Sequence, residues 1–215
     1  MNIIDILLPI TAYLYGSVPF GFLMAKWVKG VDIRDVGSGN IGATNAARAL
    51  GFKFFPIVFL LDFSKGLLPP LAASLLISSQ TEFSPHPLAA GAAVAAILGH
   101  VFPIYLKFKG GKAVATGTGA CLFLAHWAVL IAAGVWAVVF LIWRYVSLAS
   151  ICAAIALGVS VWFVFPHALE AGIFRSIFCG GAGIFVIILH HGNIRRLISG
   201  TEHKIGHKKP KTEES

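Results

Sequence analysis

Five long apolar segments, separated by shorter polar stretches, constrain this chain more than any other feature. They cover residues 3–25, 54–79, 86–106, 146–165 and 171–191. Each approaches the ~20 residues that a helix needs to cross a bilayer core. Only 12% of all residues are charged, against ~25% in a typical soluble domain. We therefore predict an all-α polytopic membrane protein.

The uncharged stretch 114–142 decides how many times the chain crosses the membrane. It is too long for one upright span and short for two full ones. If it crosses once, the basic clusters before it and the basic C-terminal segment fall on opposite faces of the bilayer. If it folds into two short helices that turn near His126 and Trp127, all of the 17 lysines and arginines except Lys65 and Arg175 become cytoplasmic.

The positive-inside rule favours the second arrangement. We predict seven transmembrane helices, two of them short, with the N-terminus outside and the C-terminus in the cytoplasm. The first segment is kept as a span because Asp5 replaces the basic start of a signal peptide and no cleavage-like site follows. The expected outer loops, near 80–87 and 165–171, contain neither Lys nor Arg.

One transmembrane domain, residues 1–200, and a polar basic cytoplasmic tail, residues 201–215, follow from this arrangement. We expect a multi-pass protein of the cell (inner or plasma) membrane. The net charge of +8 does not indicate a nucleic-acid partner, because the basic residues lie between apolar segments and in the tail. Cys121, Cys152 and Cys179 lie in apolar stretches without paired or metal-ligand spacing, so no metal site is expected.

The strongest local motif is the loop GSGNIGATN at 37–45, followed by Arg48. Its glycines free successive backbone N–H groups, and its Ser, Asn and Thr side chains add neutral donors. A guanidinium matches the geometry of phosphate or carboxylate, and such a loop entering a helix can hold an anion. The alternative interpretation is a glycine-rich turn without a ligand.

A second motif, FKGGKAVAT at 108–116, places a glycine pair between two lysines just before an apolar helix. We interpret it either as a phosphate site, with Lys112 as the charge and the glycines as backbone donors, or as an ordinary basic flank of a span. A third motif, HHGNIRR at 190–196 and GTEHK at 200–204, leaves the last span on the same side. Its alternative is a helix end with basic anchors.

Two smaller features accompany the three motifs. The segment RYVSLAS at 144–150 begins another span on the cytoplasmic side. Asp62 and Lys65, three residues apart within a span, are expected to form an intrahelical pair, since an unpaired charge there costs roughly 2.5–3.5 kcal/mol. A proton relay is the alternative interpretation.

These segments together resemble a known family. GSGNIGATN, LDFSKG, GHVFPIYLKFKGGKAVAT, RYVSLASI and HHGNIRRLISGTEHK are similar, in this order, to the bacterial membrane glycerol-3-phosphate acyltransferases that use acyl phosphate. The resemblance implies a seven-helix fold and the formation of 1-acyl-glycerol 3-phosphate (lysophosphatidic acid) in phospholipid synthesis. It also implies glycerol 3-phosphate, acyl phosphate and membrane lipid as partners, with no cofactor and no obligate protein partner.

The family's functional residues carry over onto matching positions of this chain. The implied catalytic residues are Ser38, Lys112 and His190. The implied substrate-binding residues are Asn40, Thr44, Asn45, Arg48, Gly110, Gly111, Ser147, Ser150, Asn193, Arg196 and Glu202. Two positions depart from the family pattern, with Ala113 where Gly is common and Leu189 where Arg is common. Ala113 restricts the backbone beside the expected phosphate site, and Leu189 removes any role for that arginine.

The expected reaction is attack by the C1 hydroxyl of glycerol 3-phosphate on the acyl carbonyl, with phosphate leaving. Arg48, Lys112 and Asn193 are the expected phosphate contacts, and Ser38 with its loop N–H groups could hold the acyl phosphate or the oxyanion. Either His190 or a phosphate of substrate or product accepts the proton.

The acyl chain could enter sideways from lipid along the small residues Gly117, Gly119 and Ala120. A rival function is transport of an organic phosphate, supported by the charged pair inside a span and by the short helix pair. Against it, the motifs gather on one face rather than at the midplane, where transporter sites usually lie.

Overall fold

The computed structural model describes residues 3–76, 87–164 and 170–205, and within these ranges the regular secondary structure is entirely helical. The α-helices are α1 (Ile3–Ser17), α2 (Phe20–Lys29), α3 (Ala43–Leu50), α4 (Phe54–Leu76), α5 (Pro87–Val101), α6 (Val114–Trp143), α7 (Val146–Val164), α8 (Glu170–Leu189) and α9 (His191–Ile198). Two single 3₁₀ turns, η1 (Ile33–Asp35) and η2 (Ile104–Leu106), lie in the connections. An all-helical structure is expected in lipid, because a helix satisfies its own backbone hydrogen bonds.

Five helical stretches are long and apolar enough to cross a membrane, which confirms the predicted class of protein. They are Ile3–Lys29, Phe54–Leu76, Pro87–Leu106, Val114–Trp143 and Val146–Val164. Helix α8 joins α9 at a bend of 57°, and this pair would make a sixth. The outer loops expected near 80–87 and 165–171 fall almost wholly outside the described residues.

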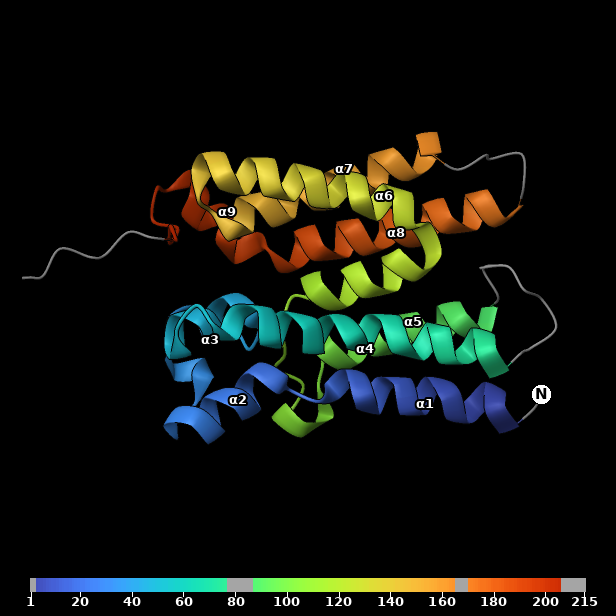
Figure 1. Cartoon of the computed structure of the whole chain (residues 1–215), viewed down its shortest axis with the longest axis horizontal. Helices are drawn as coiled ribbons and strands as arrows, with labels where there is room; N and C mark the ends of the chain where they lie inside the picture. Colours follow the sequence, from blue (N-terminus) through green and yellow to red (C-terminus); the bar gives the residue numbers. More distant parts are fainter. Residues whose placement is uncertain (1–2, 77–86, 165–169, 206–215) are drawn as a thin grey trace, which may run out of the picture.

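Helix α6 contains a break that bears on the count of crossings. Ala125 has φ −149° and ψ 59°, which are not helical angles, and residues on both sides of it are helical. Figure 1 shows the chain reversing its direction here, so that the two parts of α6 run back past each other. The break is one residue before His126, where the sequence predicts a turn. Seven crossings and the orientation of the termini stay predictions.

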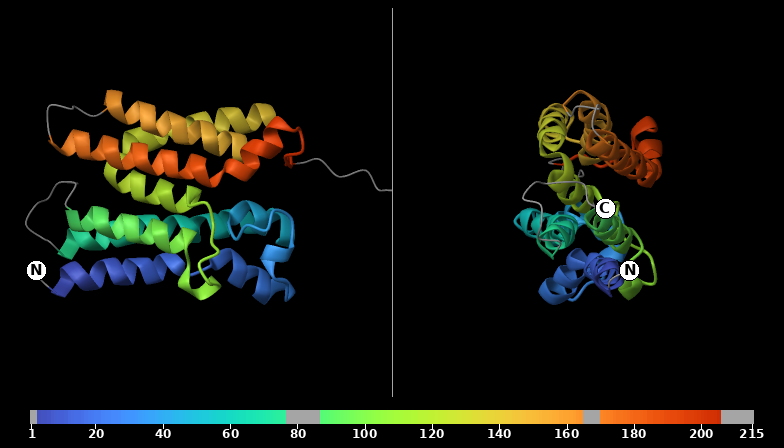
Figure 2. Two further views of the ribbon diagram at one scale, coloured as in Figure 1. Left: turned by 180° about the vertical axis from the view of Figure 1, so that it is seen from behind. Right: turned by 90° about the vertical axis from the view of Figure 1, so that its right-hand side faces the viewer.

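The helices form two groups joined by the first part of α6. Helices α1, α4 and α5 pack together on one side, and α7 and α8 pack with the second part of α6 on the other (Figures 1 and 2). The first part of α6 lies between the groups and packs closely on α4. A Cβ atom on Gly66 of α4 would collide with the carbonyl oxygen of Thr116 in α6. Small residues of this kind allow close helix packing in membranes.

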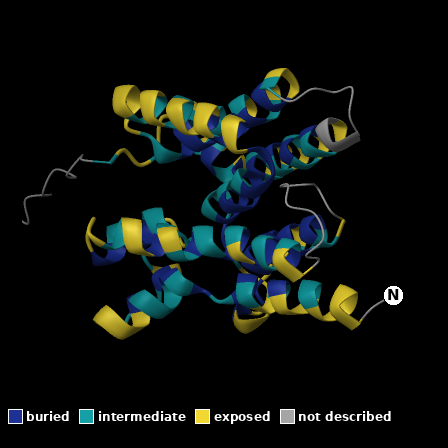
Figure 3. Ribbon diagram, turned by 45° about the vertical axis from the view of Figure 1, so that its right-hand side comes forward, coloured by how far each residue is buried: buried dark blue, intermediate teal, exposed yellow. Residues whose placement is uncertain are grey.

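The burial pattern is that of a protein surrounded by lipid. Figure 3 shows exposed residues on the outward faces of the helices and buried residues between them. Large apolar side chains such as Leu60, Phe163 and Ile177 are among the most exposed. The polar segments, by contrast, gather at one end of the molecule, where Figure 1 places α2, α3 and α9, opposite the N-terminus. The first and third motifs therefore lie at this end, and the second, in the connection between α5 and α6, lies nearer the middle of the molecule (Figure 1).

The charged pair inside α4 is present as expected. Lys65 Nζ lies 2.6 Å from Asp62 Oδ1, and both side chains are almost completely buried. The C-terminal segment is described as far as Ile205, whose N–H donates to the carbonyl of Arg144 over 3.0 Å. The end of this described segment is thus hydrogen-bonded to the connection between α6 and α7, and the predicted boundary between domain and tail at residue 200 stays a prediction.

Candidate active site

A polar cavity of about 130 Å³ lies where the motif segments meet. Its walls come from the loop leading into α3 and α3 itself, from α4, from the end of α5 and the segment that follows it, from both parts of α6, from the start of α7, and from the junction of α8 and α9 with the segment after it. The sequence-predicted residues that line it are Ser38, Asn40, Thr44, Asn45, Arg48, Lys112, Ser147, Ser150, His190, Asn193 and Glu202. Three predicted residues do not line it: Gly110, Gly111 and Arg196.

Asn45 holds the first motif loop in shape. Its Oδ1 accepts the Ser38 N–H over 2.9 Å, and its Nδ2 donates to the carbonyls of Ile33 and Val36, each over 2.9 Å. The turn also requires Gly37, which has φ 62° and whose Cβ, if present, would crowd Asn45 Oδ1. Because Asn45 is buried and its amide is occupied, its main visible role is to organise the loop.

Arg48 lies in the last turn of α3 and contributes a positive charge to the polar cavity. Within the described parts of the chain its guanidinium has no hydrogen-bonding partner. It is partly buried, and that burial lowers its pKa from the ordinary value. A guanidinium with unused donors beside a polar cavity is suited to bind a phosphate.

Lys112 is held at the opposite side by the third motif. Its Nζ donates to Asn193 Oδ1. Burial and the positive charges of Arg196 and Arg48, opposed by the negative charge of Glu202, lower the pKa of Lys112 to about 8. The ammonium therefore carries its charge at neutral pH in a place where another cation is near, which favours an incoming anion.

Glu202 joins the two C-terminal motif segments. Its Oε1 accepts from Asn193 Nδ2 over 2.7 Å and from Ser147 Oγ over 2.8 Å, and its Oε2 accepts from Arg196 Nε over 2.7 Å. Burial raises the pKa of this carboxyl, but these hydrogen bonds and the charge of Arg196 outweigh the burial and lower the pKa. Glu202 is thus ionised, and its hydrogen bonds orient Asn193 and Ser147. Arg196 acts on the cavity through its contact with Glu202.

His190 lies at the junction of α8 and α9 with one ring nitrogen engaged. Its Nδ1 is 2.7 Å from the carbonyl oxygen of Val186. Because a carbonyl only accepts, Nδ1 must carry the proton, and in the neutral ring Nε2 is then an acceptor. His190 is buried while the adjacent His191 is exposed, so the two rings do not converge.

The two glycines of the second motif pack on the end of α5. The Gly111 N–H donates to the carbonyl of His100 over 3.0 Å, and a Cβ on either glycine would collide with His100. Ala113, where the family commonly has Gly, adopts the left-handed φ of 54° that favours glycine. Leu189, where the family commonly has Arg, is partly buried against an apolar cluster that includes Ile97.

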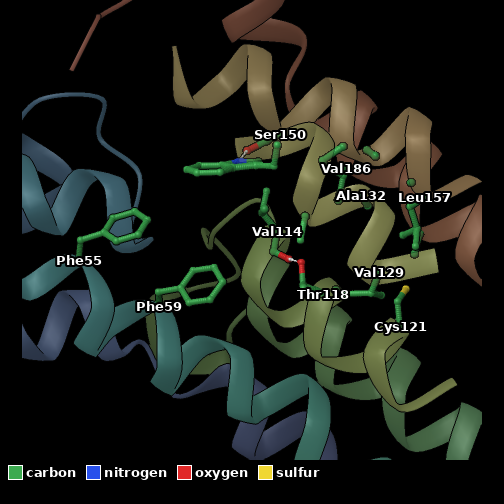
Figure 4. A pocket seen from close by; sticks show the side chains of 17 residues that line it. Phe55, Phe59, Val114, Thr118, Cys121, Val129, Ala132, Ser150, Leu157 and Val186 are labelled. Carbon is green, nitrogen blue, oxygen red and sulfur yellow. Dashed lines mark hydrogen bonds between the residues drawn. The ribbon is translucent and has the colours of Figure 1, made fainter. Parts of the chain in front are cut away.

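A second, apolar cavity of about 230 Å³ adjoins the polar one. Both cavities share the lining residues Phe55, Phe59, Val114, Trp136 and Ser150. Figure 4 shows Phe55 and Phe59 on α4 at one side and Leu157 and Val186 at the other. Of the small residues expected along an acyl path, Gly117 lines this cavity. Gly119 does not, and it packs instead against the backbone of α4; Ala120 also lies outside the lining.

Comparison with known proteins decides the family. The family described as glycerol-3-phosphate acyltransferase matches residues 6–200. The chain belongs to this family. It is similar to the glycerol-3-phosphate acyltransferase of Desulforamulus reducens, at 43% identity over 97% of this chain and 99% of that protein. It is also similar to that of Bacillus subtilis, at 43% identity over 93% of this chain and 96% of that protein.

Two solved structures of PlsY, an integral membrane glycerol 3-phosphate acyltransferase, share the fold. The glycerol 3-phosphate form superposes with a TM-score of 0.81 at 40% identity, covering 94% of this chain and 96% of that one. The lysophosphatidic acid form gives 0.79 at 39% identity, covering 94% and 95%. This agreement extends the family assignment to almost the whole described fold.

Three residues with polar side-chain atoms line the polar cavity without having been predicted as substrate-site residues. The sequence indicates Asp62 as half of an intrahelical pair or part of a proton relay, and His100 as part of a longer motif. Trp136 had no signal at all, since it lies in an apolar stretch; its Nε1 donates to Ser150 Oγ over 3.3 Å. Only the fold brings α4, α5 and the second part of α6 to the same cavity.

Proposed function

We propose that this chain transfers a fatty acyl group from acyl phosphate to the 1-hydroxyl of glycerol 3-phosphate, producing 1-acyl-glycerol 3-phosphate and phosphate. The observation that carries this proposal is the continuity of a cationic polar cavity with an apolar one, which share five lining residues. A substrate pair made of small anions and one long apolar chain fits such a space. The substrate named for the relatives, glycerol 3-phosphate, supports the acceptor.

Two cations face the polar cavity and would hold the phosphates. Arg48 has unused donors, and Lys112 is positioned by Asn193 on the far side. Ser38, exposed at the mouth of the loop, and nearby backbone N–H groups would complete the contacts with acyl phosphate or with the oxyanion. Thr44, Asn40, Ser147 and Ser150 would add neutral contacts. Such fixed donors stabilise the charge that develops in the transition state.

The chemistry needs positioning more than a strong protein nucleophile. The C1 oxygen forms a bond to the acyl carbon, the bond from that carbon to the phosphate oxygen breaks, and phosphate leaves with the electron pair. The proton of the hydroxyl goes to a base. The neutral His190 ring, with Nδ1 committed to Val186, offers Nε2 for this purpose. A phosphate oxygen is the alternative acceptor.

The acyl chain is proposed to occupy the apolar cavity. Its walls are almost entirely carbon, with Phe55, Phe59 and Trp136 at the end that adjoins the phosphate site. A chain lying there with its carbonyl at Ser150 would place the reacting carbon where the two cavities join. Because the chain would enter from lipid, which is as apolar as these walls, the closeness of its packing would decide how tightly it binds.

The donor is proposed to be acyl phosphate rather than acyl-CoA. A CoA ester brings a large adenosine-bearing head that needs a water-facing binding surface. Within the described residues, the polar end of this protein consists of short loops and three short helices, the ten-residue α2 and the eight-residue α3 and α9. An acyl phosphate has only a small anionic head, which matches a cavity of about 130 Å³.

The active site is proposed to face the cytoplasm, in a protein with seven crossings. Support comes from the break in α6 at Ala125 and from the gathering of basic segments at the end opposite the N-terminus. A cysteine at position 82 should react with a membrane-impermeant thiol reagent from outside intact cells, and one at position 205 should not. Labelling of both from one side would contradict this topology.

The test of the function uses the purified protein in lipid, labelled glycerol 3-phosphate and palmitoyl phosphate. We expect labelled 1-acyl-glycerol 3-phosphate without any soluble partner protein. Omission of palmitoyl phosphate should abolish the product. Uptake of label into vesicles without acylated product would contradict the proposal and favour transport of an organic phosphate.

A further inference from the structure

Asp62, Lys65 and His100 form a buried cluster that the proposed reaction leaves without a role. Asp62 Oδ1 lies 2.6 Å from Lys65 Nζ and 3.7 Å from His100 Nδ1. The three residues are 2%, 0% and 4% exposed. Buried ion pairs contribute little net stability, so a purely stabilising role does not account for this one. Asp62 and His100 also line the polar cavity.

His100 touches the segment that carries Lys112. Its carbonyl accepts the Gly111 N–H over 3.0 Å. A Cβ on Gly111 would collide with His100 Nε2 and the neighbouring ring carbons. The ring therefore lies directly against the backbone of the residue before Lys112, and glycine is required there because nothing larger fits.

Asp62 lies beside the same ring and is also hydrogen-bonded to α6. Its carboxylate is 3.7 Å from His100 Nδ1, which makes no hydrogen bond within the described residues, and the Gly111 backbone lies against the ring at Nε2. The backbone carbonyl of Asp62 accepts from Thr116 Oγ1 in α6 over 2.9 Å. The segment 102–113 joins α5 to α6. Asp62 therefore contacts both sides of this connection, beside His100 before it and through Thr116 after it.

Lys65 completes the cluster by balancing the charge of Asp62. Its ammonium lies 4.8 Å from the centroid of the Phe20 ring, at the start of α2. The cluster thus connects α2, α4, α5 and α6 beneath the polar cavity. Its rigid connection to the cavity runs through His100 and Gly111 to Lys112, and from Lys112 to Asn193.

We propose that His100, packed between the Asp62–Lys65 pair and the Gly111 backbone, is a positioning residue that fixes Lys112 for phosphate binding. The inference rests on the proposed function, in which Lys112 contacts a phosphate. Its physical basis is that a shift of ~1 Å in a substrate-positioning group can reduce the rate about 10²-fold. The glycine pair serves the same end, since it lets the backbone just before Lys112 pack against His100.

A double-mutant cycle between His100 and Lys112 tests this coupling. Steady-state KM and kcat for glycerol 3-phosphate are measured for wild type, His100→Ala, Lys112→Ala and the double variant in lipid. We expect His100→Ala to raise KM at least ~10-fold in the wild type and less than ~2-fold in the Lys112→Ala background, because coupled residues are non-additive. His100→Gln, which keeps bulk and polarity against Gly111, should recover part of the lost affinity.

A variant without the two charges of the Asp62–Lys65 pair tests whether this pair serves to position His100 or only to balance charge. Asp62→Asn/Lys65→Met removes both charges together and leaves no unpaired ion. We expect the melting temperature of this variant to be close to that of wild type. Its KM for glycerol 3-phosphate should rise as it does in His100→Ala. Ser160→Ala, which alters a buried hydroxyl of α7 outside the polar cavity, is the matched control with unchanged KM.

The outcomes distinguish this inference from the function on which it rests. If His100→Ala raises KM by the same factor in wild type and in Lys112→Ala, the positioning role is overturned. The acyltransferase proposal would stay intact. If the charge-free variant does not fold, the His100–Lys112 cycle alone decides. A wild type that forms no acylated product would instead overturn the proposed function.

Discussion

The polar and the apolar cavity adjoin each other but are built in opposite ways. The polar cavity is held by directed hydrogen bonds between side chains far apart in the sequence, such as Ser147 with Glu202 and Lys112 with Asn193. The apolar cavity is lined by small and apolar residues, with few polar groups near it. An anion requires hydrogen-bond donors at defined positions, whereas an acyl chain requires only an apolar space of matching shape that excludes water. Substitutions should therefore have sharp effects in the first region and graded effects in the second.

The largest effect is expected for the two cations of the polar cavity. Arg48→Ala or Lys112→Ala should lower kcat/KM for glycerol 3-phosphate by at least ~10²-fold, the usual loss for one preorganised donor. Lys208→Ala and Lys209→Ala, outside the described residues, are the matched controls and should be nearly silent. Equal activity of all four variants would mean that the motifs are ordinary basic flanks of spans.

A smaller, selective effect is expected in the apolar cavity. A Cβ atom at Gly117 would meet no atom within 4 Å, so a larger side chain there has room to enter the cavity. Gly117→Leu should lower kcat/KM for palmitoyl phosphate by roughly 10-fold and affect a short-chain acyl phosphate far less, since misfit of a few methylenes costs 1–3 kcal/mol. KM for glycerol 3-phosphate should stay unchanged. An equal loss for both chain lengths would contradict the assignment of this cavity to the acyl chain.

The pH dependence should follow Lys112. The pKa of Lys112 is lowered to about 8, so its side chain is positively charged below pH 8 and loses this charge as the pH rises above 8. KM for glycerol 3-phosphate should therefore rise above pH 8, by at most roughly tenfold per pH unit. Lys112→Arg keeps its charge at these pH values, so its KM should be flat between pH 7 and 9.5. A rise of the same size in Lys112→Arg would assign the alkaline limb to another group.

The smallest effect is expected at Ala113, a buried residue that precedes α6 and lines the polar cavity. Its left-handed φ of 54° costs a non-glycine residue about 1–2 kcal/mol. Ala113→Gly should raise the free energy of unfolding by part of that cost, measured by denaturation in detergent, with little change in kcat. Ala133→Gly, in the exposed interior of α6, is the control and should lower it by about 1 kcal/mol.

Much of the polar cavity could be predicted from the sequence because its donors lie in compact motifs. The side chains expected to contact phosphate are those of Arg48, Lys112 and Asn193, and their ability to do so does not depend on the fold. The charge pattern predicts that all three lie on the same side of the membrane. The glycines at 110 and 111 show the limit. Flexibility suggests backbone donors for phosphate, but the structure packs both against His100, a contact that no local pattern reveals.

The apolar cavity could hardly be predicted at all. Gly117, Gly119 and Ala120 are equivalent in sequence terms, yet only Gly117 lines the cavity, because Gly119 faces the backbone of α4. Trp136 reaches the boundary of both cavities only because the chain reverses near Ala125. Which small residue faces a ligand and which faces a helix depends on helix rotation, and uniformly apolar spans carry no signal for that.

One comparison of donors tests most directly whether a single small-headed acyl donor occupies both cavities. Initial rates are measured for matched palmitoyl phosphate and palmitoyl-CoA under the same lipid conditions, with and without added inorganic phosphate. The proposal predicts efficient transfer from palmitoyl phosphate, poor transfer from palmitoyl-CoA, and inhibition by phosphate, which competes for Arg48 and Lys112. Comparable kcat/KM values for the two donors would contradict it.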